Sequence, residues 1–382
     1  MNKRQKMSSL QVVSMVLYML LGAWIGFQLA DLPLGDGPLT QQIAAVAGCI
    51  LCLYLAIYLQ LIIHEAGHLL FGLLTGYRFS SFRIGSTIWV RLNGKIARRR
   101  YSLAGTGGQC LMCPPDMADG SMPFALYNLG GVILNAVSGL LFLALYLWLP
   151  QSGLISLTLQ ILAAFSIVLA LTNGLPLHGF VDNDGRNVLS LRRNPGALRA
   201  FWIQLKINDL QREGVRLRHM PEEWFAVTPD ADRSNTLITA IQVFACNRLL
   251  DAHDFREAEL RMHQLLESDA AVELLHRALL TCDSAYCAMI AHHPQEEIAA
   301  MLDDKRQKKI MKAMRGFPSV LRTQYARALL VDQNAEEAKK LLARFEVCAK
   351  TYPYATEIES ERELMQIAME AQSRENTNCT PQ

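Results

Sequence analysis

Four long apolar stretches constrain the fold of this chain more than any other feature. They are Leu10–Ala30, Ile43–Leu74, Phe124–Leu149 and Leu154–Leu177. Each is long enough to cross a bilayer as a helix, which needs about 20 residues. Charged residues are scarce up to about residue 178 and dense beyond residue 190. We therefore expect an α-helical membrane protein with about four transmembrane helices, followed by an all-α soluble domain.

The first apolar stretch follows a basic start that contains Lys3, Arg4 and Lys6. Cleaved signal peptides share this arrangement. However, this run is about 20 residues long, which exceeds a typical signal core, and no Ala-x-Ala site ends it. We expect it to be kept as a membrane helix.

The distribution of basic residues predicts the orientation in the membrane. Cytoplasmic loops are enriched in Lys and Arg. The loop after the first stretch carries Asp31 and Asp36 and no basic residue, whereas the loop after the second carries seven: Arg78, Arg83, Arg91, Lys95, Arg98, Arg99 and Arg100. This pattern predicts a multi-pass protein of the cell membrane with both termini in the cytoplasm. The net charge of +2 gives no reason to expect a nucleic-acid partner.

The second apolar stretch contains the motif His64-Glu65-Ala-Gly-His68. On a helix, residues four apart lie on one face, so both imidazoles can bind one metal ion. Glu65 lies at the edge of that face, where its carboxylate can take a proton from a metal-bound water. Zinc with three protein ligands keeps a fourth position for that water and lowers its pKa to about 7. The ligand types favour zinc, one ion per chain.

The position of this motif inside an apolar stretch makes it more informative than its residues alone. Two histidines and a glutamate inside a membrane helix cost a few kcal/mol unless they are paired or hydrated. A third ligand must come from elsewhere, and the segment after the fourth stretch offers one. Its Asn and Pro interrupt the apolar run, which is tolerated at membrane depth where the backbone lines protein or a cavity. Asp184-Gly185 then brings a carboxylate into a flexible turn, with Asp182 and His178 as alternatives.

The His64–His68 motif in one span, with Asn173-x-x-Pro176 leading to Asp184 after another, resembles the site-2 protease family of intramembrane zinc metalloproteases. The resemblance covers roughly residues 40–190. It implies a metalloendopeptidase with Asp184 as the third zinc ligand. The spacing from Asn173 to Asp184 is longer than the common family spacing, and position 181, where a shorter spacing would end, is Val. Asp184 is favoured because Gly follows it.

Two polar residues in the other spans are candidates for contact with substrate. Gly130–Asn135 is similar to the family's Gly-x-x-x-Asn signature. Asn135 therefore faces the site or forms an interhelical hydrogen bond worth about 1 kcal/mol. Asn173 is the second candidate.

The loop Phe79–Pro114 carries a hairpin signal. Apolar residues alternate from Phe82 to Leu92, Asn93-Gly94 follows, and the return strand lies within Ile96–Leu103. The glycines that come next permit close backbone approach. A free strand edge beside the metal would pair with an extended substrate and hold it open, with Gly107 and Gly108 contacting it. A basic face toward lipid headgroups is an alternative use, and the two can coexist.

Nine cysteines are present, and in a reducing compartment most should be free thiols. Cys110-x-x-Cys113 has metal spacing, but no second pair follows at the distance of a zinc ribbon. We do not expect a metal there.

The second half of the chain predicts a helical-repeat domain. We place a transmembrane metalloprotease domain at residues 1–195, a cytoplasmic α-helical domain at 196–372 and a disordered tail at 373–382. Ala245–Ala258 and Tyr325–Ala338 each resemble half of a tetratricopeptide repeat, and Glu296–Leu302 is a weaker third copy. Such domains usually bind partners, so a cytoplasmic protein partner is expected. An ordinary helical bundle that caps the protease is the alternative.

Two hypotheses from different classes follow. The first is an intramembrane zinc metalloendopeptidase that cleaves membrane proteins or membrane-anchored peptides. The second is a non-catalytic membrane scaffold whose helical domain binds a partner. The presence of His64, Glu65, His68 and Asp184 together argues against the scaffold. A metal transporter would need more ligands within the membrane than these four spans carry.

Overall fold

A computed structural model describes residues 9–30, 38–103, 106–150, 153–176, 182–228 and 230–378. The chain divides into two compact units. The membrane unit consists of Met1–Arg78, Gly107–Cys110 and Met122–Arg193, and the helical unit consists of Phe79–Thr106, Leu111–Ser121 and Asn194–Gln382.

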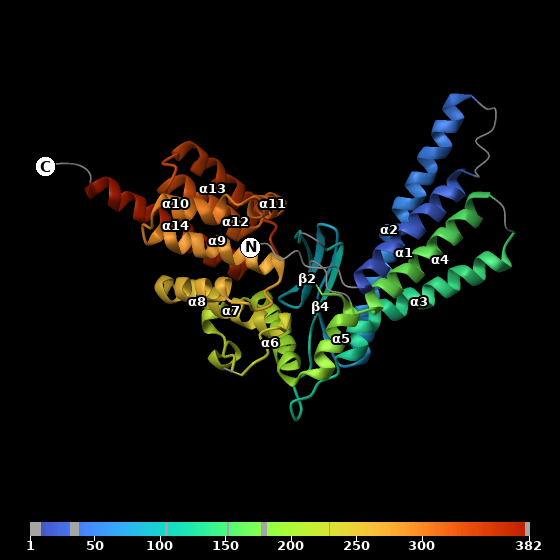
Figure 1. The fold of residues 1–382 in the computed structure, drawn as a ribbon, viewed down its shortest axis with the longest axis horizontal. Helices are drawn as coiled ribbons and strands as arrows, with labels where there is room; N and C mark the ends of the chain where they lie inside the picture. The colour runs from blue at the N-terminus through green and yellow to red at the C-terminus, as the bar shows by residue number, and fades with distance from the viewer. Residues whose placement is uncertain are drawn as a thin grey trace. The chain divides into compact units, whose positions relative to one another are not determined.

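Four helices form the body of the membrane unit (Figure 1). They are α1 (Ser9–Ala30), α2 (Leu39–Leu74), α3 (Ala125–Trp148) and α4 (Gly153–Gly174). Helix α2 packs against α3 and α4, α3 packs against α4, and α1 packs against α4. Among the described residues, α2, α3 and α4 are long and apolar enough to cross a membrane. The apolar part of α1, Val12–Phe27, is shorter, so a fourth span stays a prediction.

Apolar side chains of these helices face both inward and outward. Cys49, Ala56 and Ile161 belong to the core of the bundle. Leu55, Leu140 and Ile155 are 54%, 64% and 71% exposed. Helices that are apolar on all sides suit a lipid environment, because water would penalise the outward face.

A four-stranded sheet follows α2. Its strands are β1 (Arg78–Ile84), β2 (Thr87–Leu92), β3 (Lys95–Arg100) and β4 (Gly108–Cys113), in the order β3-β2-β1-β4. The predicted Asn93-Gly94 hairpin is present: Leu92 pairs with Lys95, and Asn93 and Gly94 have φ angles of 48° and 77°. The expected single strand from Phe82 to Leu92 is wrong, because the chain turns at Gly85, whose φ is 59°. Strand β4 was not predicted.

Helices α6 to α14 make up most of the helical unit. Their bounds are α6 (Pro195–Arg212), α7 (Thr236–Asp251), α8 (Phe255–Glu267), α9 (Leu274–Ile290), α10 (Gln295–Leu302), α11 (Lys305–Ala313), α12 (Pro318–Leu330), α13 (Ala335–Ala349) and α14 (Ala355–Asn378). The short 3₁₀ helices η1 (Leu217–His219) and η2 (Glu222–Trp224) separate α6 from α7. Helix α14 extends through 373–378, where we expected a disordered tail, and residues 379–382 lie outside the described part.

The predicted repeat halves coincide with two helix–turn–helix pairs, α7–α8 and α12–α13. In both, a residue with positive φ precedes an N-cap: His253 (62°) before Asp254, and Gln333 (47°) before Asn334. Each cap accepts a hydrogen bond from a main-chain N–H three residues later. Both segments therefore contain a turn between two helices, while membership of a tetratricopeptide-like class stays a prediction.

Candidate metal centre

Helix α2 brings the two motif histidines together. One turn separates them, and their Nε2 atoms lie 3.3 Å apart. Both residues are 9% exposed, and Glu65 between them is 6% exposed. The i, i+4 spacing therefore produces the predicted pair of inward-facing imidazoles.

Hydrogen bonds from α3 determine which ring nitrogens face each other. His68 Nδ1 lies 2.8 Å from the main-chain oxygen of Tyr127. A carbonyl only accepts, so Nδ1 carries the proton and Nε2 presents a lone pair. His64 Nδ1 lies 2.8 Å from Asn135 Oδ1. The same argument holds there once the orientation of the Asn135 amide is fixed.

Gln60 fixes that orientation. Asn135 Nδ2 donates to Gln60 Oε1 over 2.9 Å and lies 3.4 Å from the Gln60 main-chain oxygen. Gln60 Nε2 in turn donates to the Leu162 carbonyl of α4 over 3.4 Å. A continuous hydrogen-bonded path thus runs from α4 through Gln60 and Asn135 to His64. Gln60 was not among the predicted site residues, although a Gln one turn before His64 in an apolar span was a visible signal.

Asp184 begins helix α5 (Asp184–Arg193), and its neighbours hold it there. The side chain of Asn183 donates to the Thr172 and Leu175 carbonyls over 2.7 and 2.5 Å, and it accepts from the Arg186 N–H. Gly185 leaves no space for a side chain, because a Cβ there would lie 2.0 Å from the Gly174 oxygen. Glycine is therefore needed after Asp184 because the main chain there contacts the end of α4.

The three side chains fit a metal ion. Asp184 Oδ2 lies 3.2 Å from His64 Nε2 and 3.6 Å from His68 Nε2. This oxygen is buried, and among the described residues it has no hydrogen-bond partner. Lone pairs that converge in this way repel each other unless a cation lies between them. Two ligand atoms of a tetrahedral zinc are about 3.3–3.4 Å apart, given bonds of about 2.0–2.1 Å. Among the described residues, His64, His68 and Asp184 are the group that could hold an ion.

Glycines let α3 approach the histidines. A Cβ at Gly67 would lie 2.2 Å from the Gly130 oxygen, so the backbones of α2 and α3 touch. A Cβ at Gly131 would lie 2.5 Å from His64 Cε1. The close approach brings the Asn135 side chain and the Tyr127 carbonyl within reach of the imidazoles.

Strand β4 borders Glu65. A Cβ at Gly108 would lie 2.4 Å from Glu65 Oε1, and one at Gly107 would lie 3.2 Å from Leu61 Cδ2. The Tyr127 hydroxyl donates to the Cys110 carbonyl over 2.8 Å and ties the strand to α3. The glycines selected from the sequence therefore place a main chain beside Glu65, and their contact with substrate stays a prediction.

The remaining candidates do not belong to the ligand group or fall outside the described part. Asp182 is described but does not belong to the group. Asn173 donates to the Leu169 carbonyl of its own helix over 3.0 Å, so its contact with substrate stays a prediction. His178 falls outside the described residues.

Cys110 and Cys113 do not join a metal group in the described part of the chain. Residues three apart on a strand point to opposite faces. Burial raises the pKa of the Cys110 thiol, and the charge of Glu65 raises it further. A thiol held in its neutral form is a poor metal ligand.

Comparison with known proteins identifies the membrane part of the chain. Residues 38–178 match the family model described as Peptidase M50B-like. This segment is similar to that family. The match confirms the predicted relationship to site-2 proteases, and it contains both histidines, Glu65 and Asn135. Asp184 lies beyond the matched residues, so its place at the site rests on the geometry above. No curated protein and no solved structure matches the chain.

Gln60→Leu should weaken zinc binding by about 10-fold or more, because loss of a residue that orients a metal-binding histidine typically costs 10–100-fold. Without the Gln60 oxygen, the Asn135 amide can rotate and leave His64 Nδ1 without an acceptor. Asn135→Ala should cost at least as much. Competition with a chromophoric chelator measures both affinities.

The two residues should act as a unit. The double variant Gln60→Leu/Asn135→Ala is expected to bind zinc about as tightly as Asn135→Ala alone. Ser138→Ala serves as the control, because the Ser138 hydroxyl donates to the Asn135 main-chain carbonyl within α3 and not to the Asn135 side chain. Losses that add up in the double variant would show that Gln60 does not act through Asn135.

Proposed function

We propose that the protein is an intramembrane zinc metalloendopeptidase that hydrolyses peptide bonds of membrane-embedded or membrane-anchored substrates. The observation that carries the proposal is the convergence of His64 Nε2, His68 Nε2 and the orphaned Asp184 Oδ2 in the membrane unit of an M50B-like peptidase. His64, His68 and Asp184 would hold one zinc ion. When bound, zinc supplies Lewis-acid chemistry that lowers the pKa of water and stabilises negative charge.

Glu65 is the proposed general base and acid. It lies one residue from His64, and its buried carboxylate packs against the main chain of Gly108. There it takes a proton from the attacking water and later delivers it to the leaving amine. Asn135 and the Tyr127 carbonyl keep both imidazoles oriented throughout.

The neighbouring edge strand supplies a way to hold the substrate. A helical substrate resists hydrolysis, because its peptide groups are shielded and hydrogen-bonded. Strand β4 lies at one edge of the sheet, and Gly108 packs against Glu65. A substrate that unwinds and pairs with β4 would present an extended peptide bond beside the catalytic carboxylate. Gly107 and Gly108 lack side chains that would block this approach.

The expected cellular setting follows from the same reasoning. The protein would lie in the cell membrane with both termini in the cytoplasm. The helical unit would recruit or gate substrate, or bind a cytoplasmic protein.

Removal of metal tests the proposal. Purified protein in detergent should contain about one zinc per chain and should cleave some members of a panel of single-span peptides. Dialysis against a chelator should abolish cleavage, because the reaction depends on the ion that the three ligands hold. Added zinc should restore cleavage. Metal content is measured by mass spectrometry and cleavage by the mass of the products.

A protein that purifies and reconstitutes without any affinity for zinc would overturn the assignment. The non-catalytic scaffold would then be the better hypothesis. Cleavage that survives complete zinc removal would also contradict it.

A further inference from the structure

The helical unit contains a cavity of about 600 Å³ with an unusual combination of side chains. We name it the aromatic–arginine pocket. Tyr101, Phe317 and Tyr352 form its aromatic wall, and Arg100, Arg315 and Arg344 line its rim. The ring of Tyr101 lies 5.6 Å from that of Tyr352 and 6.2 Å from that of Phe317. The volume is within the range of ligand-binding pockets.

The pocket is cationic and has no acid in its lining. Its three arginines are exposed, and none forms an ion pair within the described part of the chain. The Arg344 guanidinium donates to the main-chain oxygen of Arg315 over 2.9 Å, a contact that neutralises neither guanidinium. Val347, also in the lining, is 66% exposed. Exposed cations around an apolar surface suit an anionic ligand that has an apolar group.

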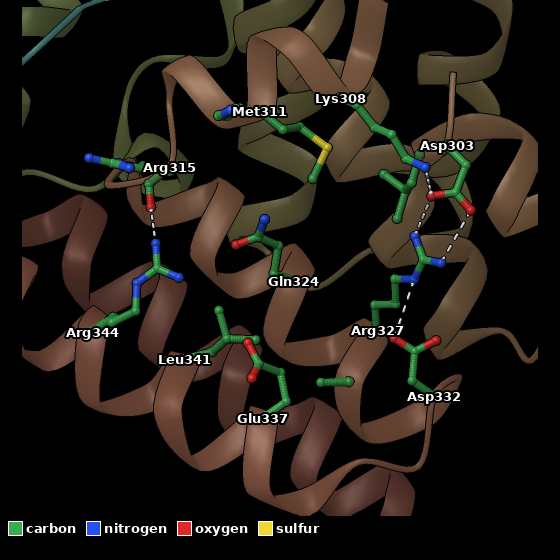
Figure 2. A pocket seen from close by; sticks show the side chains of 13 residues that line it. Asp303, Lys308, Met311, Arg315, Gln324, Arg327, Asp332, Glu337, Leu341 and Arg344 are labelled. Carbon is green, nitrogen blue, oxygen red and sulfur yellow. Dashed lines mark hydrogen bonds and ion pairs between the residues drawn. The ribbon is translucent and has the colours of Figure 1, made fainter. Parts of the chain in front are cut away.

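A neighbouring cavity of about 430 Å³ provides a contrast (Figure 2). There Arg327 pairs with Asp303 and Asp332, and Lys308 pairs with Asp303. Arg315 and Arg344 line this cavity as well, at the end away from those ion pairs. Asp303 and Asp332 thus compensate Arg327 and Lys308 at one end, whereas Arg315 and Arg344 form no ion pair within the described part of the chain.

The strand that leads into the pocket has a free edge. The Tyr101 N–H donates to the Ser86 oxygen. In this antiparallel pairing, the main-chain N–H and C=O groups of the odd-numbered residues of β3 therefore point toward β2. The N–H groups of Ile96, Arg98 and Arg100 therefore face away from the sheet. That of Arg100 already donates to the Thr351 carbonyl over 3.0 Å. Within the described part of the chain, the N–H groups of Ile96 and Arg98 remain open to a partner strand, while the Arg98 carbonyl accepts from the Arg99 guanidinium over 3.1 Å.

We propose that the β3 edge and the aromatic–arginine pocket together dock an acidic, extended peptide segment of a partner protein. Its main chain pairs with Ile96 and Arg98, one apolar side chain enters the pocket, and its carboxylates meet Arg100, Arg315 and Arg344. The continuity of a strand edge with the pocket favours a peptide over a lipid, since a lipid headgroup cannot continue a sheet. This inference does not depend on proteolytic activity.

Fluorescence anisotropy of labelled peptides tests the proposal on the full-length protein in detergent. The probe is a 12-residue peptide with four Asp or Glu residues and one central Phe. We expect saturable binding that weakens at high salt. Phe→Ser in the peptide, or Asn and Gln in place of its acids, should weaken binding by about 10-fold or more.

Variants of the protein locate the site. Arg315→Glu/Arg344→Glu should weaken binding of the acidic peptide by at least about 10-fold, because two attractions become repulsions. Lys309→Glu/Lys340→Glu reverses the same charge on α11 and α13 at exposed positions outside the pocket and should change binding less than about 2-fold. Equal binding to both double variants would overturn the proposal.

Peptide chemistry tests the strand pairing without changing the protein. N-methylation at alternate residues of the probe should weaken binding at every second position, where an N–H faces β3, and leave the positions between unaffected. Losses without this period would overturn pairing with β3. Displacement of the peptide by nanodiscs that contain anionic lipid, but not by neutral ones, would assign the surface to the membrane instead.

Discussion

Glu65→Gln should lower the rate of peptide cleavage by on the order of 10²–10⁴-fold while zinc remains bound. Glutamine preserves the size of the side chain and its packing against Gly108, but it cannot take a proton from water. The histidines and Asp184 are unchanged, so metal content should stay at about one ion per chain. Single-turnover cleavage of a peptide that the wild type cuts measures the rate, and mass spectrometry measures the metal.

The separation of the two readouts makes this result informative. Glu65→Asp is the companion variant, because it keeps a carboxylate but withdraws it from the site, and it should retain more activity than Glu65→Gln. Cleavage that continues at the wild-type rate in Glu65→Gln would exclude Glu65 as the proton carrier. Loss of zinc together with activity would assign Glu65 a role in binding the metal.

Asp184→Asn should release the metal. The substitution removes the only negative charge among the three ligand atoms and leaves a neutral amide where Oδ2 now faces His64 Nε2 at 3.2 Å. We expect zinc affinity to fall by at least about 100-fold, more than for loss of an orienting residue. Cleavage should fall in parallel and should recover in part at high zinc concentration.

Asp182→Asn is the matched control. It makes the same chemical change two residues earlier, at a carboxylate outside the candidate ligand group. It should retain zinc and activity, and thermal unfolding should show that both variants fold. If Asp182→Asn lost the metal while Asp184→Asn kept it, the assignment of the third ligand would be reversed.

Local patterns predicted the parts of the structure that depend on neighbours in sequence. Spacing along one helix was sufficient to place His64 and His68 on a common face. The Asn-Gly pair determined a hairpin turn because both residues accept positive φ. Asp254 and Asn334 begin helices because their side chains accept hydrogen bonds from the first turn.

Contacts between distant segments were harder to predict. Gln60 and the Tyr127 carbonyl act on the histidines only because α2, α3 and α4 pack together, which no local pattern specifies. Strand β4 was missed because its glycine-rich start has low strand propensity, and its pairing with β1 is not local. Pro221-Glu-Glu has the composition of a helix start, yet it opens only the single turn Glu222–Trp224.

The division of the chain has a consequence for how the protein can be taken apart. The polypeptide passes between the two units five times, and β4 itself begins in one and ends in the other. Ile88 and Val90 of the sheet are fully buried, and Arg91 and Arg100 bond through their main chains to Arg212 and Thr351 of the helical unit. The first three strands therefore belong with the second half of the chain, although they precede α3 and α4 in sequence. A fragment that ended after Arg193 would keep every candidate metal ligand but lose the scaffold around the strand that borders Glu65.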